Sequence, residues 1–243
     1  PQEASKLLAA ARRPECVIIH RSEYDAALDE FVQRCHAQKV PVGADFDDLV
    51  FDPEVLRRGY LRFVSAGPVE VQQHWQNRVA AYRQLLLNAD FGVATTPVLA
   101  RAMQRVRGDC WPVLVRPNGV SAAHAALAAR LRAAPPRPDD GRPRTLYAAG
   151  TATHDVDFAT VVEPVARFLE RYPDWILTVI GPVDLAPLVR RVPGERIERR
   201  RVVPHEDLAK ELARADINLA PLEPGNPLCD AKSPLKYYEA ALV

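Results

Sequence analysis

The sequence lacks several features that would assign a protein to a broad class at once. No apolar run approaches the roughly 20 residues of a membrane-spanning helix. The four cysteines form no CxxC pair and no zinc-type spacing, so we expect reduced thiols of a cytoplasmic protein rather than disulfides or a zinc site. Excess charge is also missing. Lys+Arg number 32 and Asp+Glu 31, and this balance disfavours binding of nucleic acid through bulk charge.

What is present is typical of a folded globular protein. A hydrophobic share of 48% and a charged share of 26% exclude wholesale disorder. A length of 243 residues fits one large domain or two small ones. The chain begins with Pro1, shows no signal-peptide pattern, and ends at Val243 inside a predicted helix. We therefore expect a piece of a longer protein.

The first half alternates strands with helices. The buried apolar runs at 15–20 and 40–46 predict strands, and the spacing of apolar residues at 24–38 predicts a helix between them. Further along, we expect a helix at 69–88, a strand at 91–95, a helix beginning at Pro97 with Thr96 as its N-cap, and a strand at 113–115. A strand–helix–strand order of this kind favours a parallel sheet.

The second half repeats the alternation after a proline-rich stretch at 133–143. We predict strands at 145–149, 175–181, 197–203 and 217–221, helices at 156–172, 183–191, 205–214 and from 234 onward, and a loop at 222–232. The sequence therefore predicts an α/β fold with two Rossmann-like doubly wound parallel-sheet domains, both incomplete. We expect an N-terminal domain at 1–122, a linker at 123–143 and a C-terminal domain at 144–243.

The loop at 150–155 is the first candidate for ligand binding. Ligands of open parallel sheets bind at the carboxyl ends of the strands, and small residues let a backbone approach a ligand closely. A helix N-terminus following this loop would suit phosphate. Thr153, His154 and Asp155 are therefore candidate substrate-binding residues. The alternative is that Thr153 or Asp155 simply caps the helix and that His154 is a solvated bystander.

The segment at 230–239 is the second candidate. Ser233 and Pro234 predict a helix start, with serine as the N-cap and proline at the first helical position. Lys236 then lies in the first turn, where a cation is unfavourable unless an anion binds nearby. Lys232 and Glu239 complete the candidate set, although a solvated pair of Lys236 and Glu239 is the simpler alternative. Lysine is rare here, with 5 against 27 arginines.

The acidic loop at 45–48 is the third candidate. Carboxylates at a strand end can hold a sugar hydroxyl, bind a metal or act as a base. Asp47 and Asp48 can equally form a turn and cap a helix. Since no partners occur at metal-ligand spacing, we expect no metal site.

Several segments resemble the GT-B glycosyltransferases, and in particular the bacterial branch of the retaining family 4, also called glycosyl transferases group 1. The residues at 215–224 and 226–241 resemble the donor-site segment of that family. The loop at 150–158 resembles the opening of its C-terminal domain, and the residues at 47–52, 90–96 and 117–120 resemble parts of its N-terminal domain.

This resemblance implies a nucleotide sugar held by the C-terminal domain and an acceptor held by the N-terminal domain, with neither metal nor cofactor. Glu239 matches the second glutamate of a paired-glutamate motif that holds the donor ribose, and Ser233, Lys232 and Lys236 would face the diphosphate. The chain departs from the pattern at the first glutamate. Its place is taken by Ala231, and the nearest acid, Asp230, is one position off. The Arg and Lys that many relatives carry after the first strand are not evident.

We therefore predict a hexosyltransferase-type glycosyltransferase that moves a sugar from a nucleotide-sugar donor to a saccharide or lipid-linked acceptor in bacterial surface polysaccharide synthesis. Asp47 and Asp48 are its candidate catalytic residues, and the activity of this piece alone is left open. We expect a cytoplasmic protein that binds no nucleic acid, with peripheral contact at the inner face of the membrane as a further option. The alternatives are a non-catalytic GT-B-like module of a larger enzyme and a GT-B-like nucleotide-sugar epimerase.

Overall fold

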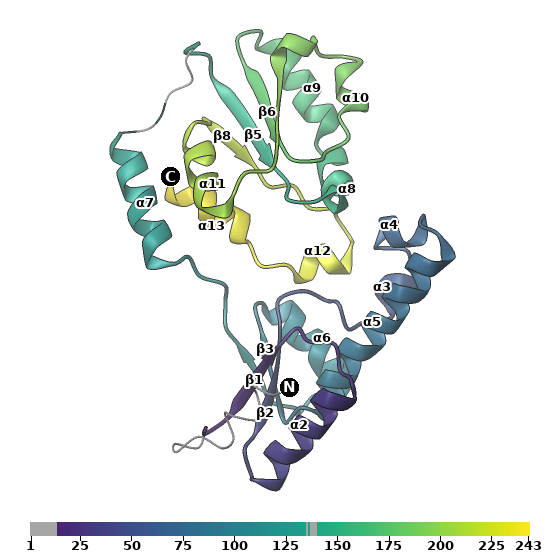
Figure 1. Cartoon of the computed structure of the whole chain (residues 1–243). Coiled ribbons are helices and arrows are strands. Elements are labelled where there is room, and N and C mark those ends of the chain that lie inside the picture. The colour runs from purple at the N-terminus through teal and green to yellow at the C-terminus, as the bar shows by residue number, and fades with distance from the viewer. Residues whose placement is uncertain (1–13, 135, 137–139) are drawn as a thin grey trace. The chain divides into compact units, whose positions relative to one another are not determined.

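A computed structural model describes residues 14–134, 136 and 140–243 (Figure 1). The chain divides into two compact units. Unit 1 comprises the chain up to Asn118 together with Gly225–Ser233, and unit 2 comprises Gly119–Pro224 together with Pro234–Val243. The nine residues Gly225–Ser233 thus belong to unit 1, although the segments before and after them belong to unit 2.

Unit 1 is built on a parallel sheet of four strands. These are β1 (Val17–His20), β2 (Val42–Phe46), β3 (Phe91–Ala94) and β4 (Val113–Val115), and they lie side by side in sequence order. In the register, Ala44 of β2 is paired with Ile19 of β1 and with Gly92 of β3. Because every crossover moves in the same direction, right-handed connections place the intervening helices on one face.

The helices of unit 1 begin and end as their sequences dictate. Those of the unit are α2 (Ala26–Ala37), α3 (Glu54–Arg57), α4 (Arg62–Ser65), α5 (Val69–Asn88), α6 (Pro97–Arg107) and α12 (Pro227–Ala231). The side chain of Asp25 caps α2 by accepting from the N–H of Leu28, and Thr96 caps α6 by accepting from the N–H of Leu99. The other face of the sheet carries Ile18 and Leu114, which are 51% and 60% exposed.

Unit 2 also has a parallel sheet of four strands, but their order is different. The strands β5 (Arg144–Ala148), β6 (Ile176–Ile180), β7 (Ile197–Arg200) and β8 (Ile217–Leu219) lie in the order β7-β6-β5-β8. The chain moves outward from β5 to β7 and then returns to the other side of β5. The point at which the direction reverses therefore lies between β5 and β8, and such a reversal is where open parallel sheets bind ligands.

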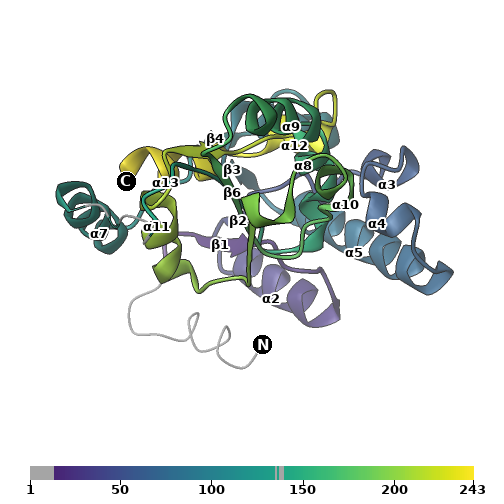
Figure 2. The same ribbon diagram turned by 90° about the horizontal axis from the view of Figure 1, so that it is seen from above.

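Helices cover both faces of this second sheet (Figure 2). On one face α8 (Asp155–Ala159), α9 (Val162–Arg171) and α10 (Ala186–Val189) pack over Tyr147 and Leu177, and on the other α11 (His205–Ala213) and α13 (Leu235–Leu242) pack over Leu146 and Ile180. Helix α7 (Ala122–Ala133) packs against α11. Single 3-10 turns lie at Ala152–His154 and Gly194–Arg196.

Gly181 ends β6 in a conformation that a side chain would not permit. Its φ is +97°, and a Cβ built there would lie 1.8 Å from the carbonyl oxygen of Ala149. Glycine is therefore required where the ends of β5 and β6 meet.

The structure confirms the predicted α/β class with two parallel sheets, and it differs from several local expectations. The loop expected at 222–232 contains α12, which Asn226 caps by accepting from the N–H of Leu228. The helix expected at 156–172 is two helices, α8 and α9, because the chain turns at Thr160–Val161 and Pro164 falls in the first turn of α9. The linker expected at 123–143 includes α7, and its residues 135 and 137–139 lie outside the described residues.

Ser233 does not cap the last helix. Helix α13 begins at Leu235 after Pro234, with no side-chain cap. The hydroxyl of Ser233 instead accepts a hydrogen bond of 3.1 Å from the side-chain amide of Asn118 within unit 1. This tertiary contact takes the oxygen that the sequence pattern assigns to the helix end.

Candidate functional site

A cavity of about 150 Å³ opens on the α11–α13 face of unit 2, along β5, β6 and β8 and at their carboxyl ends. We call it the switch-point cavity. Its walls are mainly apolar, from Leu146, Ile180, Leu212 and Leu219. Helix α13 contributes two charged side chains, those of Lys236 and Glu239, which lie three residues apart and on one side of the helix. The reversal in strand order therefore coincides with a cavity that carries one cation and one anion.

Lys236 is held at the end of β5. Its Nζ donates to the main-chain oxygen of Ala148 at 3.0 Å and lies 5.1 Å from the centre of the Tyr147 ring. A cation over an aromatic face is attracted by the ring electrons. Burial raises the pKa of Tyr147 above its usual range, with help from the charges of Asp157 and Asp155, so its hydroxyl stays protonated. These contacts aim an ammonium group at the carboxyl ends of the strands.

Glu239 is buried, and His205 at the start of α11 holds it. The Nε2 of His205 lies 2.8 Å from Oε1 of Glu239, and their side chains are 68% and 9% exposed. Because a carboxylate only accepts, this nitrogen carries the proton. In the described part of the chain, Oε2 of Glu239 has no hydrogen-bond partner. The carboxylate is thus fixed by one oxygen and can accept a ligand hydroxyl with the other.

His124 of α7 extends this arrangement. Its ring centre lies 5.4 Å from that of His205, and its buried Nε2 has no partner among the described residues. Three side chains from three helices, α7, α11 and α13, therefore meet beside the switch-point cavity.

The loop that follows β5 is tied to its neighbours rather than open. Thr153 pairs with Thr151 through their hydroxyls at 2.7 Å, and a carboxylate oxygen of Asp155 accepts from the N–H of Asp184. Nδ1 of His154 lies 3.0 Å from Oδ2 of Asp157. Neither Thr153 nor Asp155 caps α8, whose N-cap is His154. The capping alternative is therefore wrong for this loop.

Asp157 joins the two loops that flank the strand reversal. Besides contacting His154, its Oδ1 accepts from the N–H of Glu223 at 3.0 Å, and its side chain is buried. The loops after β5 and after β8 are therefore held together by one carboxylate.

The candidate residues of the 230–239 segment fall into both units. Lys232 and Ser233 belong to unit 1, whereas Lys236 and Glu239 belong to unit 2. The structure brings Lys236 and Glu239 together at the switch-point cavity.

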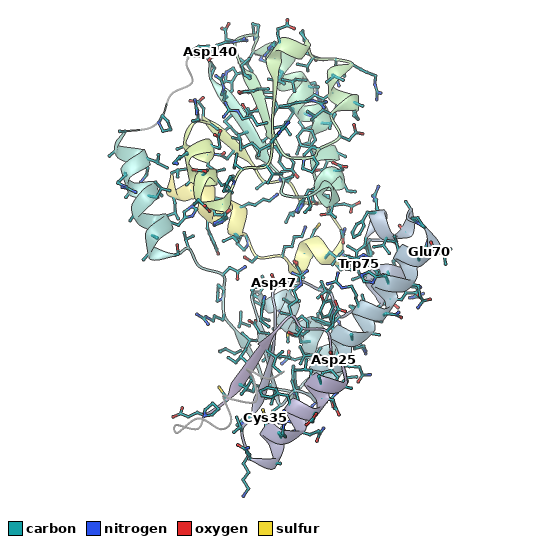
Figure 3. All side chains as sticks on the ribbon, in the orientation of Figure 1. Asp25, Cys35, Asp47, Glu70, Trp75 and Asp140 are labelled. Carbon is teal, nitrogen blue, oxygen red and sulfur yellow. The ribbon has the colours of Figure 1, made fainter. Side chains whose placement is uncertain are left out.

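The acidic loop lies beyond the carboxyl end of β2 in unit 1, where Figure 3 labels Asp47. One guanidinium nitrogen of Arg21 donates to Asp47 at 2.9 Å and to Asp48 at 3.1 Å. Arg21 holds this position with a φ of 41°, which is uncommon for a residue with a side chain. Thr95 also donates to the main-chain oxygen of Asp47. Among the residues that the structure describes, the two carboxylates thus share one cation, and each keeps one oxygen for another partner.

Within residues 14–134, 136 and 140–243, no group of three or more His, Cys, Asp or Glu side chains could hold a metal ion. In the same residues, no helix is both long and apolar enough to cross a membrane.

Sequence reasoning misses His205, Asp157 and Arg21. Each acts on a carboxylate or a backbone group far away in the chain, so no local pattern points to it. The one local signal is the spacing of three between His154 and Asp157.

Comparisons with known proteins place the fold. No family model matches the chain, and no curated protein matches its sequence. Solved structures do match. A trehalose-6-phosphate synthase has a TM-score of 0.55 at 15% identity, covering 91% of this chain and 55% of that chain. A sucrose-phosphate synthase from Thermosynechococcus elongatus has a TM-score of 0.52 at 19% identity, covering 90% and 54%.

An alpha,alpha-trehalose-phosphate synthase (UDP-forming) from Burkholderia vietnamiensis has a TM-score of 0.54 at 15% identity and covers 96% of this chain and 60% of that chain. The chain therefore spans little more than half the length of these structures. Its two parallel α/β units have the GT-B fold of the glycosyltransferases.

Proposed function

We propose that this chain is part of a retaining, family 4-like glycosyltransferase that moves a hexose from a nucleotide-sugar donor to a saccharide or lipid-linked acceptor. The observation that carries the proposal is the meeting of Lys236 and Glu239 at the switch-point cavity of a GT-B fold. The printed name of one structural neighbour, a UDP-forming synthase, supports a nucleotide-sugar donor. Bacterial surface polysaccharide synthesis in the cytoplasm, with contact at the inner face of the membrane, is the setting that we infer.

The donor would bind by its ribose and its diphosphate. The cavity holds only part of a nucleotide sugar, and we assign the ribose to it because the unpartnered oxygen of Glu239 suits a hydroxyl donor. The ammonium group of Lys236 would exchange its bond to Ala148 for the diphosphate, a charge-assisted contact. Thr153, His154 and Asp155 stand at the same end of the sheet, and we keep them as candidate contacts.

Titration of the full-length protein with UDP-, GDP- and dTDP-sugars tests this assignment. Lys236→Ala should weaken binding by about 1.5–3 kcal/mol, the range for a charge-assisted hydrogen bond. Glu239→Gln should weaken it as well. Lys210→Ala is the matched control, because Lys210 is an exposed lysine of the same unit whose Nζ pairs with Asp207. Dissociation constants in Lys236→Ala that equal those of the control would overturn the donor site.

The acceptor side is proposed at the acidic loop. If Asp47 and Asp48 bind acceptor hydroxyls or assist proton transfer, Asp→Asn should lower turnover by about 10²–10⁴ and leave donor affinity unchanged. Asp25→Asn is the control, since Asp25 caps α2 and asparagine caps about as well. Wild-type turnover in Asp47→Asn and Asp48→Asn would remove both residues from the site. Turnover should survive EDTA, and loss that Mg²⁺ restores would instead make these aspartates metal ligands.

One observation favours a non-catalytic GT-B module as the second candidate. Asp47 and Asp48 are both already paired with Arg21, which suits a purely structural role. A module of this kind would bind nucleotide sugars or glycans without turnover, so measuring binding and turnover on one preparation separates the two functions.

A further inference from the structure

A second, larger cavity lies in unit 1, away from the sheet. It has a volume of about 540 Å³ and is bounded by α5 on one side and by α3 and α4 on the other. We call it the helical groove. It lies beside the part of α5 that projects beyond the sheet, where Figure 3 labels Glu70 and Trp75. Its volume falls within the range of about 300–1,000 Å³ that is usual for small-molecule sites.

Helix α5 lines the groove with polar side chains on one face. Gln72, Gln76 and Arg83 follow each other at intervals of four and seven residues, and such positions share a face of a helix. The apolar floor comes from Val79 of α5 and from Leu56 and Val64 on the opposite wall. The groove thus combines an apolar base with amide groups and a guanidinium.

Arg83 is the charged side chain of the groove for which the described residues supply no partner. Its side chain is half-buried and, within the described part of the chain, it makes no hydrogen bond or ion pair. Arg57 on the opposite wall differs, because Glu54 pairs with its guanidinium, with Nε 2.7 Å from Oε1. A half-buried guanidinium that has five donors and no counter-charge suits a bound anion.

The amides add acceptors and donors for a hydroxylated ligand. The side-chain amide of Gln72 donates one N–H to the main-chain oxygen of Gly67 at 3.0 Å. Its carbonyl oxygen can therefore still accept a hydrogen bond from a ligand. Gln76 has no hydrogen-bond partner among the described residues, so both its amide N–H groups and its carbonyl oxygen are available to a ligand. From Gln76 to Arg83 the helix rises about 10 Å, which is roughly the length of a phosphorylated hexose.

We propose that the helical groove binds a sugar that carries a phosphate or a carboxylate. Arg83 holds the anionic group, Gln72 and Gln76 hold ring hydroxyls, and the apolar floor packs against the C–H face of the ring. The proposal deepens the proposed function. It rests on that function only in taking this ligand to be the acceptor. Binding itself requires no donor.

Binding to the chain of residues 1–243 should be measured by calorimetry with ligands that share one ring. These are glucose 6-phosphate, glucuronate and glucose, with inorganic phosphate as the anion alone. We expect one of the two anionic sugars to bind at least about tenfold more tightly than either glucose or phosphate, since each of those lacks half of the contacts. The better anionic sugar identifies the group. Equal affinity for phosphate and both sugars would overturn the proposal, because the groove would then recognise only charge.

Variants locate the site. Arg83→Gln should weaken binding of the anionic sugar by about 10- to 100-fold, and Gln76→Leu by about 3- to 10-fold. Arg101→Gln is the matched control, because Arg101 is an exposed arginine on α6 without a partner among the described residues. Thermal melts verify that each variant is folded. Unchanged binding in Arg83→Gln, or an equal loss in Arg101→Gln, would overturn the assignment.

The outcome is separable from that of the donor site. Arg83→Gln should leave the affinity for nucleotide sugars as it is, since Lys236 and Glu239 belong to unit 2. Failure of the sugar titration with donor binding intact overturns the groove alone. Sugar binding without donor binding supports the groove and overturns the donor site.

Discussion

The two units build the same kind of sheet from the same alternation of strands and helices, and they differ in strand order. In unit 1 the order follows the sequence, and α2, α5 and α6 cover one face. In unit 2 the order reverses at β5, so helices cover both faces. The chain leaves β5 on one side of the reversal and β8 on the other, and a cavity opens beside the ends of these strands. In unit 1 the cavity of about 540 Å³ lies between helices instead.

The units also treat their carboxylates differently. Asp47 and Asp48 are half-exposed and share Arg21, so their charge is balanced from outside the sheet. Glu239 is buried, and within the described part of the chain His205 is its partner. Asp47 and Asp48 follow a strand and remain near solvent, whereas Glu239 lies on α13 and lines a cavity.

The largest expected effect concerns the glycines that let strands and helices approach. Gly181→Ala in unit 2 should cost about 3 kcal/mol or more in the free energy of unfolding, because the new Cβ meets the fixed oxygen of Ala149 and φ is positive. Gly92→Ala in unit 1 should cost less. Its Cβ would meet the flexible end of Met103 at 2.8 Å, although Trp111 is as close. Urea denaturation measures both.

Gly194→Ala is the control for this pair, since a Cβ there meets nothing within 4 Å. If Gly92→Ala and Gly181→Ala lowered the free energy of unfolding equally, a clash with side-chain atoms would cost as much as a clash with the backbone, and the expected difference would be wrong.

The second effect concerns the segment at 225–233, which belongs to unit 1. The buried hydroxyl of Thr96 caps α6 and also donates to the main-chain oxygen of Ala231 at 2.8 Å. Thr96→Val keeps the shape and removes both bonds, so we expect a loss of about 2 kcal/mol in stability. Thr96→Ser retains both bonds and should lose less than half of that. Equal losses would mean that the methyl group, not the hydroxyl, holds the segment.

The third effect compares two histidine–carboxylate pairs. His205→Ala leaves the buried Glu239 without its partner and should cost about 1–2 kcal/mol. His20→Ala in unit 1 should cost less than about 1 kcal/mol, because His20 and Asp45 are 59% and 28% exposed and water replaces the contact. Thermal denaturation at pH 7 distinguishes them. A larger loss in His20→Ala would contradict the contrast in burial.

The smallest expected effect is a loss of stability of unit 2 at low pH. A hydrogen bond from Arg144, with a further one from the backbone of Arg142, holds the pKa of Asp140 at about 2. A carboxyl whose pKa is lower in the folded state stabilises the fold above its unfolded pKa, near 4, and this contribution is lost as the pH falls towards 2. Melting temperatures followed from pH 6 to pH 2 should therefore fall less steeply in Asp140→Asn than in the wild type. Parallel curves would exclude the contribution.

Much of the fold was predictable because buried faces repeat at regular intervals. The helix at 69–88 and the strand at 113–115 have the bounds that the sequence predicts. The helix α12 was missed because it is short, although Asn226 followed by Pro227 carries the signal of a helix start. The order of the strands cannot be obtained from local patterns, since it depends on which β-strands pair across long stretches of chain.

The site was predictable only in part, for a similar reason. Lys236 and Glu239 share a helix, so their spacing places them together. His205 reaches Glu239 from 34 residues away, and the Asn118 that takes the hydroxyl of Ser233 lies 115 residues away. Such contacts form only once the fold exists, so the sequence pattern alone assigns Ser233 to a helix cap.

The detour of the chain at 225–233 has a consequence for the order of events at the ribosome. Most of unit 1 is synthesised before Asn118, but α12 emerges roughly a hundred residues later, after nearly all of unit 2. Translation adds about 5–20 residues per second, so α12 is synthesised on the order of ten seconds after the rest of unit 1. Throughout that time the hydroxyl of Thr96 lacks the carbonyl of Ala231, and the surface of α6 that α12 covers stays bare to solvent and to chaperones. Completion of the first unit is thus timed by translation of the second.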